Sequence, residues 1–394
     1  MNRAVAIAAA GAFLSTNTVQ AQVQESTEGL AMQEARAKMM TERGKTISYT
    51  KKWDLNGLPK YQPQHKVSGT IRIWGSNYIV DGFLGGYWEA AFKKYHPDAK
   101  LDYQMKTTLA AVPSLVFGVA DLGIGRKITF AEQELFERYK DRAPVEIELA
   151  TGSYDMNGWQ PGYGIVVHKD NPISRLSMKQ LDGIFGAERL GGWEGTSWRP
   201  NWARGPEENI RTWGQLGLTG DWKDKPINVY GLTLRYHQAT EISDLVLKAS
   251  DKWNERLRIY ANYVSAGGKL ERGLNADLAK DRYGISYIAA PTSTLTGRAM
   301  PPSLKVLAIA TKENGPYVPY SLETLHDRSY PLYSRIYAYT DRALGQPMDP
   351  KVLEFLRFVL SQEGQAEVMR DGKYLPLTAD VVQAQLKKLQ ELSK

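Results

Sequence analysis

Residues 304–377 read LKVLAIATKENGPYVPYSLETLHDRSYPLYSRIYAYTDRALGQPMDPKVLEFLRFVLSQEGQAEVMRDGKYLPL. The signals in this stretch come in a fixed order: a strand, a loop, a Tyr-Pro-Leu turn at 330–332, a second strand and a helix. A glycine-bounded stop follows, and then Tyr-Leu-Pro-Leu at 374–377. Strands and helices that follow one another in this way are typical of an α/β domain.

The same alternation of strands and helices extends through the rest of the chain. Residues 70–74, 101–105 and 119–124 predict strands, each followed by apolar residues at helical spacing. Capping boxes predict the starts of two helices, and a further helix is expected over 240–254. The two capping boxes are formed by Thr129 with Glu132 and by Ser177 with Gln180. Alternation of this kind predicts mostly parallel sheets flanked by helices.

Length and composition narrow the class of protein. The chain has 394 residues, more than one core usually needs, so two lobes are expected. Lys and Arg total 50 against 43 Asp and Glu, and this net charge of +7 favours anions near the surface. No run rich in Lys and Arg stands out in the sequence, so nucleic-acid binding is not predicted. The chain has no cysteine, which excludes disulfides, Cys nucleophiles and iron–sulfur clusters.

The first residues predict export. Arg3 precedes the apolar run 4–14, and Val-Gln-Ala at 19–21 resembles a cleavage site. We expect residues 1–21 to be a signal peptide and the mature chain to be a periplasmic monomer; the alternative is an N-terminal core helix. Residues 22–67 are interpreted as an extension that forms a tether or arm. The first lobe is expected at 68–160 plus 305–394 and the second at 161–304.

Several segments resemble, in the same order, the periplasmic phosphate-binding protein of bacterial ABC transporters. Besides the C-terminal stretch, they are Gly-Ser-Asn at 75–77, ADLGIGR at 120–126, GIVVHKDNPISRLSMKQLDGIF at 164–185 and YGISY at 283–287. The resemblance implies a two-lobe type II periplasmic binding protein fold with hinge crossovers. It also implies capture of a small anion, an ABC permease as partner, no cofactor and no catalysis.

The resemblance places two ligand loops in the first lobe. Amide N–H groups where strands end and helices begin favour an anion, a Ser hydroxyl adds a donor, and an Arg adds a bidentate clamp. Ser76 and Arg126 fit these two roles by position. Each has a plainer alternative, because Ser76 is also a preferred helix cap and Arg126 could form a surface ion pair.

The second lobe departs from the family. Where the family has an Arg and then Ser-Gly-Thr, residues 230–238 read YGLTLRYHQ, with bulky Tyr236 and His237 in place of small residues. The Asp that some members use to accept a proton from phosphate has no clear counterpart near Gly125. The loop could form a site for another oxyanion or an organic anion, or could fill a cleft that no longer binds tightly. The candidate ligand-binding residues are Gly75, Ser76, Asn77, Gly125, Arg126, Thr233, Arg235 and His237.

Other signals point away from an enzyme. Nucleophile elbows, Walker loops and metal-type His spacings are absent from the sequence. The tryptophans at 193, 198, 202, 213 and 222 could stack on a ligand or could pin a long irregular segment onto the second lobe.

Three functions follow from these signals. The leading hypothesis is an exported solute-binding protein for phosphate, a related oxyanion or an organic phosphate. The second is a two-lobe scaffold or sensor that acts through a protein partner, and the third is a phosphate-ester hydrolase, for which no nucleophile or metal set is visible.

Overall fold

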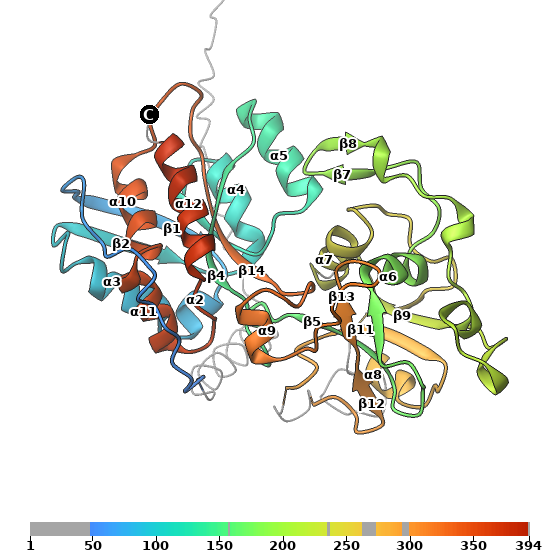
Figure 1. Ribbon diagram of the computed structural model, residues 1–394. Helices are drawn as coiled ribbons and strands as arrows, with labels where there is room; N and C mark the ends of the chain where they lie inside the picture. The colour runs from blue at the N-terminus through green and yellow to red at the C-terminus, as the bar shows by residue number, and fades with distance from the viewer. Residues whose placement is uncertain (1–47, 157, 235–236, 262–272, 294–298, 393–394) are drawn as a thin grey trace, which may run out of the picture. The chain divides into compact units, whose positions relative to one another are not determined.

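Two five-stranded sheets organise the part of the chain that the computed structural model describes. The described residues are 48–156, 158–234, 237–261, 273–293 and 299–392. The expected signal peptide and residues 22–47 lie outside them. Each sheet forms one lobe with its own helices (Figure 1).

The first sheet has the strand order β2-β1-β3-β14-β4. β1 is parallel to β2 and β3, and β14 is antiparallel to both of its neighbours, so β14 runs against the other four strands. The strands are β1 (Gly69–Gly75), β2 (Ala99–Gln104), β3 (Leu122–Gly125), β4 (Val145–Thr151) and β14 (Arg335–Thr340).

Alternating residues of β14 explain how helices cover both faces of this sheet. Ile336 and Ala338 are buried in one hydrophobic cluster, whereas Tyr337 and Tyr339 belong to another, as expected for side chains that alternate along a strand. Figure 1 shows α10 and α12 apart from α4 and α5. The helices are α2 (Tyr78–Asp81), α3 (Leu84–Phe92), α4 (Ala111–Val116), α5 (Phe130–Lys140), α10 (Pro350–Val359), α11 (Gln362–Asp371) and α12 (Ala379–Leu392).

The second sheet has the order β10-β9-β11-β5-β12. β9 is parallel to β10 and β11, and β5 is antiparallel to β11 and β12. Each sheet thus has one reversed strand, which confirms the expected mostly parallel α/β lobes. The strands are β5 (Tyr163–His168), β9 (Asn228–Leu232), β10 (Arg258–Tyr260), β11 (Gly284–Ala289) and β12 (Leu304–Val306).

Two helices, one in each lobe, begin where the sequence predicts. Both predicted capping boxes form, at the starts of α5 and α6. The helix expected over 240–254 is shorter, because Lys248 and Ala249 adopt positive φ just beyond its end. The helices are α6 (Met178–Phe185), α7 (His237–Val246), α8 (Leu274–Leu278) and α9 (Leu322–His326).

Two chain crossovers join the lobes side by side. The first runs from β4 to β5, and the second reaches β14 from β13 (Ala308–Ala310). The Gly152 amide donates to Ser334 O and the Tyr163 amide to Leu332 O, both at 2.9 Å. The expected return to the first lobe at residue 305 is too early, because β12 pairs with β5 and β13 with β6 (Arg175–Ser177).

Residues 48–67 pack against the lobes instead of forming the arm that the sequence suggests. Leu55, Leu58 and Tyr61 are buried in its core, where apolar burial stabilises the fold. The Tyr61 hydroxyl also donates to Glu354 Oε2 at 2.6 Å. Residues 55–67 therefore belong to the first lobe, whereas Trp53 stacks on His326 of the second lobe, with ring centroids 3.6 Å apart.

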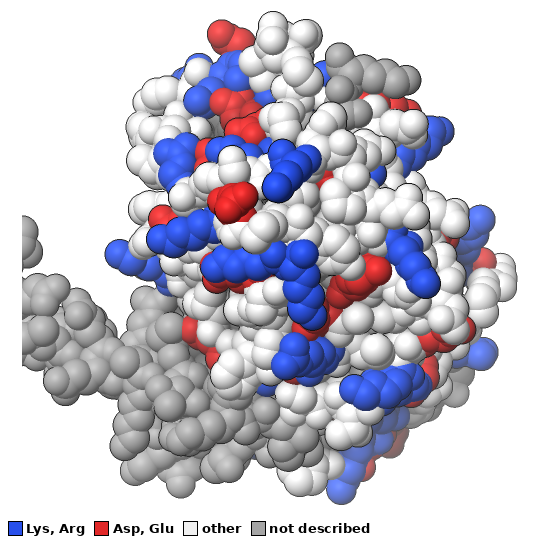
Figure 2. Space-filling model, turned by 90° about the vertical axis from the view of Figure 1, so that its left-hand side faces the viewer, with Lys and Arg blue, Asp and Glu red and all other residues white. Residues whose placement is uncertain are grey.

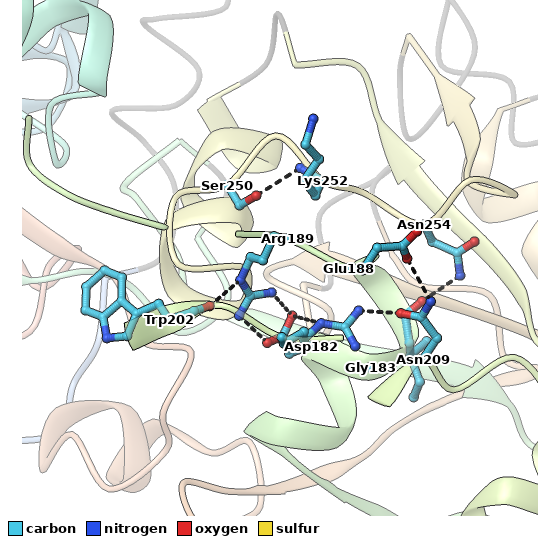
Figure 3. Close-up of polar contacts among 12 residues, drawn as sticks. Asp182, Gly183, Glu188, Arg189, Trp202, Asn209, Ser250, Lys252 and Asn254 are labelled. Atoms are coloured by element: carbon cyan, nitrogen blue, oxygen red, sulfur yellow. Dashed lines mark hydrogen bonds and ion pairs between the residues drawn. The ribbon is translucent and has the colours of Figure 1, made fainter. Parts of the chain in front are cut away.

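The tryptophan-rich segment 187–226 is irregular, as expected, and polar contacts hold it to the second lobe (Figure 3). Arg189 forms two bonds of 2.6 Å to Asp182 of α6 and donates through Nε to Trp202 O at 3.0 Å. The segment includes the hairpin of β7 (Gly192–Glu194) and β8 (Ser197–Arg199). Its short 3₁₀ turns are Pro200–Trp202, Pro206–Glu208, Trp213–Leu216 and Gly220–Trp222.

The surface mixes charges of both signs. Figure 2 shows Lys and Arg interspersed with Asp and Glu on the face it presents. Such a surface differs from the one-sided basic patch of a nucleic-acid-binding domain. Among the described helices, none has the length and apolar character needed to cross a bilayer.

Candidate functional site

The two predicted loops of the first lobe meet at the ends of adjacent parallel strands. Gly75 lies opposite Ile124, and the Ser76 amide donates to Ile124 O at 2.8 Å. Gly75 has φ +133°, and a Cβ there would lie 2.0 Å from Ile124 O, so only glycine allows this approach. The strand pairing therefore brings residues 75–77 and 125–126 together, as the sequence predicts.

The Ser76 hydroxyl does not cap a helix. Asn77, not Ser76, occupies the cap position of α2, and its side chain makes no cap hydrogen bond. Asn77 Nδ2 instead donates to Asp81 Oδ2 at 2.5 Å. Both Ser76 and Asn77 are buried. The helix-cap alternative for Ser76 is therefore wrong.

Arg126 is a buried member of an ion pair, only 5% exposed, so the surface-pair alternative is also wrong. Its Nη1 donates to Glu132 Oε2 at 2.9 Å and its Nη2 to Glu132 Oε1 at 3.2 Å, and Nη1 also donates to Lys127 O at 2.6 Å. Burial alone lowers the pKa of Arg126, but the Glu132 carboxylate outweighs it and leaves that pKa raised.

The geometry leaves part of the guanidinium available. An Arg side chain carries five N–H donors, and the bonds of Arg126 within the described chain use both hydrogens of Nη1 and one of Nη2. The Nε–H and the second Nη2–H of Arg126 have no partner among the described residues. Glu132 was not predicted as part of the site, although its capping box with Thr129 places it one turn into α5.

The second lobe contributes the start of α7. Thr233 follows β9, and its amide is already bonded to Tyr260 O at 2.9 Å. His237 is the first residue of α7, and burial, followed by the positive charge of Arg126, lowers its pKa to about 4. The His237 imidazole is therefore neutral at neutral pH and lies within electrostatic range of Arg126 of the first lobe. Arg235, also a predicted ligand residue, lies outside the described residues, as does Tyr236.

Glu241 is a site residue that the sequence analysis missed. It lies one helical turn beyond His237 and is 7% exposed. Its carboxylate accepts hydrogen bonds from Gln160 Nε2, on the first crossover, and from the Tyr163 hydroxyl. Burial raises the pKa of Glu241 to about 7. The spacing of four residues from His237 on an α-helix was the available signal, because it puts both side chains on one face.

We expect the native chain to become less stable as the pH rises from about 4.5 to 7, and Glu241→Gln to lack this pH dependence. A carboxyl whose pKa is higher in the folded state stabilises that state while protonated, and the contribution fades as pH rises through the folded pKa. The folded value is about 7 and the ordinary value 4.5. At about 1.4 kcal/mol per unit, the effect is on the order of 3 kcal/mol.

Urea unfolding at pH 5 and pH 8 measures this difference for the native chain and the variant. Glu134→Gln is the control, since Glu134 is half-exposed on α5 and pairs only at 3.7 Å with Arg138. Equal pH slopes for the native chain and Glu241→Gln would contradict the assignment.

A pocket of 360 Å³ lies between α7 and the first lobe, beside this site. Lys127 bonds to both oxygens of Glu146, at 2.7 and 2.6 Å, and Arg328 pairs with Glu148 at 2.7 Å. Asp244 also lines the pocket, with an exposed side chain. The lining residues are Lys127, Glu146, Glu148, Glu241, Asp244, Leu245, Tyr333, Ser334, Arg335 and Tyr337.

The site presents hydrogen-bond donors from both lobes. Arg126 offers two N–H groups, His237 a neutral ring, and Ser76 a hydroxyl at the end of β1. The described residues contain no cluster of His, Asp and Glu suited to a metal ion. A small oxyanion is the ligand class that matches donors of this kind.

Comparisons with known proteins bear on the family of this chain. A family model for the PBP superfamily domain matches residues 62–363. The phosphate-binding protein PstS of Pseudomonas aeruginosa is 30% identical over 334 residues, which cover 84% of this chain and 90% of that protein.

Solved structures with a similar fold were also found. An ABC-type phosphate transport receptor from Vibrio cholerae is 17% identical, with a TM-score of 0.45, over 77% of this chain and 99% of that one. PstS from Borrelia burgdorferi is 16% identical, with a TM-score of 0.47, over 79% of this chain and 100% of that one.

Proposed function

Because the chain belongs to the periplasmic binding protein superfamily, as a divergent phosphate-binding protein, we propose that it captures phosphate or a related oxyanion between its two lobes. Delivery to an ABC transporter permease is part of the proposal. The observation that carries it is the buried Arg126: two of its N–H groups have no hydrogen-bond partner among the described residues, and its charge helps to lower the pKa of His237 in the second lobe. Membership in this family makes the chain a binding protein and not an enzyme.

The proposed capture uses donors from both lobes. The Ser76 hydroxyl contacts the anion from the first lobe, and Arg126 binds it through Nε–H and Nη2–H. Glu132 holds the guanidinium in one orientation, so little rotamer freedom is lost on binding. The start of α7 approaches from the second lobe, and rotation about the two crossovers closes the lobes over the ligand.

The choice of anion is the finer part of the proposal. Three carboxylates, those of Glu132, Glu241 and Asp244, lie at or near the site, and a fully ionised oxyanion is repelled by them. Protonated oxyanions and singly charged phosphate esters suffer less repulsion. The pocket beside Glu241 leaves room for an organic substituent. These features favour an organic phosphate or a monoanion over fully ionised phosphate.

A thermal-shift experiment tests the proposed function. A ligand that binds only the folded chain stabilises it by about 2.7 kcal/mol at a hundred times its Kd. We therefore expect millimolar phosphate, arsenate, a phosphonate or a phosphate ester to raise the Tm by several degrees. Sodium chloride at matched ionic strength is the control. If no oxyanion in the series shifts the Tm beyond this control, the proposed function is wrong.

Export is proposed together with this function. We infer that residues 1–21 are removed as a signal peptide and that the mature monomer works in the periplasm. Intact-mass measurement of the protein recovered from a periplasmic extract tests this directly. A mass that still includes residues 1–21 would rule out cleavage.

The alternative of a scaffold or sensor loses part of its basis. Residues 48–67 were one reason for it, and they pack against the lobes instead of forming an exposed arm. The altered loop at 230–238 is the remaining reason, and the thermal-shift experiment decides whether that loop still supports ligand binding.

A further inference from the structure

A second contact between the lobes lies away from the crossovers. The β7–β8 hairpin, residues 192–199, extends from the second lobe, and Figure 1 shows it beside α5 of the first. The backbone ties this hairpin to its own lobe, because the Trp193 amide donates to Lys248 O at 2.9 Å, just beyond α7. Its turn is therefore the part that reaches the other lobe.

Polar groups at the turn bond to α5. Thr196 Oγ1 lies 2.8 Å from Glu137 Oε2 and 3.0 Å from Glu137 Oε1, so its hydroxyl donates to a carboxylate of the first lobe. Gln133 Nε2 donates to the same carboxylate at 2.7 Å. A hydrogen bond to a charged acceptor is stronger than one between neutral groups. The turn is thus bonded to one face of α5.

An aromatic pair lies beside these hydrogen bonds. The rings of Phe130, the first residue of α5, and Trp193 have centroids 4.8 Å apart at an angle of 55°. Trp193 also packs on Trp198 with centroids 5.0 Å apart, which holds its indole in place. Aromatic pairs in this distance range stabilise beyond the apolar area they bury.

The backbone of the turn fits closely against α5. Gly195 has φ +60°, and a Cβ added to it would lie 2.9 Å from the Gln133 amide group. A residue with a side chain would be strained in this conformation and would press against α5. Glycine therefore lets the turn approach the helix.

We propose that the β7–β8 hairpin is a latch that holds the two lobes closed even without ligand. The crossovers allow the lobes to rotate apart, and a contact away from the crossovers opposes this opening. The latch consists of three contacts between the hairpin and α5. They are Thr196 with Glu137, Trp193 with Phe130, and Gly195 with Gln133. A ligand shifts the equilibrium between the open and closed lobes only through its different affinity for the two states. The latch changes how much of each state is present before the ligand binds. Opening for ligand entry or release must break these contacts.

The distance between the lobes tests the latch directly. Because the chain has no cysteine, Leu190→Cys and Leu344→Cys place two spin labels selectively, one on each lobe. Both positions are highly exposed, at 86% and 75%. In the ligand-free protein we expect Thr196→Val and Glu137→Ala to shift the label distances to a longer, broader distribution. Glu134→Ala, on the same helix but without a contact to the hairpin, should leave the distribution unchanged.

The outcome is independent of the proposed anion, because the measurement is made without ligand. Circular dichroism checks that each variant is folded, and Gly195→Ala provides a further variant that should act in the same direction. If the distributions of Thr196→Val and Glu137→Ala match that of the parent, the hairpin does not act as a latch. A second set of measurements with inorganic phosphate reports on the function separately: a shift there with no effect of the latch variants supports binding and overturns the latch.

Discussion

Arg126→Ala is expected to weaken phosphate binding by roughly ten- to a hundredfold. The variant loses two donors and a charge at a buried position, and we expect a total loss of about 1.5–3 kcal/mol, the usual contribution of a hydrogen bond to a charged group. Isothermal titration with phosphate, or with whichever oxyanion gives the largest thermal shift, measures the loss. An affinity within about twofold of the native value would place Arg126 outside the binding site.

The same substitution should also reduce stability. Arg126 and Glu132 form a buried pair, with 5% and 15% of their side chains exposed. Removing one member of a buried pair leaves the other charge uncompensated and typically costs about 3–5 kcal/mol. Glu132 keeps the donors of Thr129, so the lower end of that range is expected.

Two controls separate binding from folding. Arg126→Lys keeps the charge but not the planar fork, so its affinity should fall between those of the native chain and Arg126→Ala. Arg138→Ala removes a 72%-exposed arginine of α5, the helix that carries Glu132, and should change neither quantity. The affinity measurement is made well below the Tm of each variant, so that loss of fold cannot imitate loss of binding.

Trp213→Ala is expected to destabilise the chain by about 3–5 kcal/mol, the usual cost of removing a buried large aromatic side chain. Trp213 is fully buried, and its Nε1–H donates to Tyr283 O at 3.3 Å. Its ring also meets that of Trp222 edge to face, with centroids 6.2 Å apart. The indole thus anchors the segment 187–226 to the sheet of the second lobe.

Urea unfolding measures the effect, with Trp198→Ala as the matched control. Trp198 belongs to the same segment but is 46% exposed, so its removal should cost far less. Equal losses for the two variants would contradict the anchoring role. A loss of anion affinity in Trp213→Ala at full stability would favour the alternative in which the tryptophans stack on a ligand.

Local signals in the sequence were sufficient for most of the elements. The capping boxes at Thr129 and Ser177 form as predicted, because each depends only on residues within one turn of helix. The adjacency of Ser76 and Arg126 also followed from the sequence, since parallel neighbouring strands end at one edge of a sheet. The end of α7 was missed, because positive φ at Lys248 and Ala249 has no clear sequence signature.

What the sequence by itself determined is the α/β class, the order of its elements and the family. These depend on residue periodicity and on neighbours along the chain. Only the tertiary structure decided that Glu132 engages Arg126, that Glu241 is buried against Gln160, and that Thr196 reaches Glu137. The last two pairs lie 81 and 59 residues apart in sequence. A bond between distant residues exists only once the lobes are folded and packed, because no local preference of either residue specifies the other.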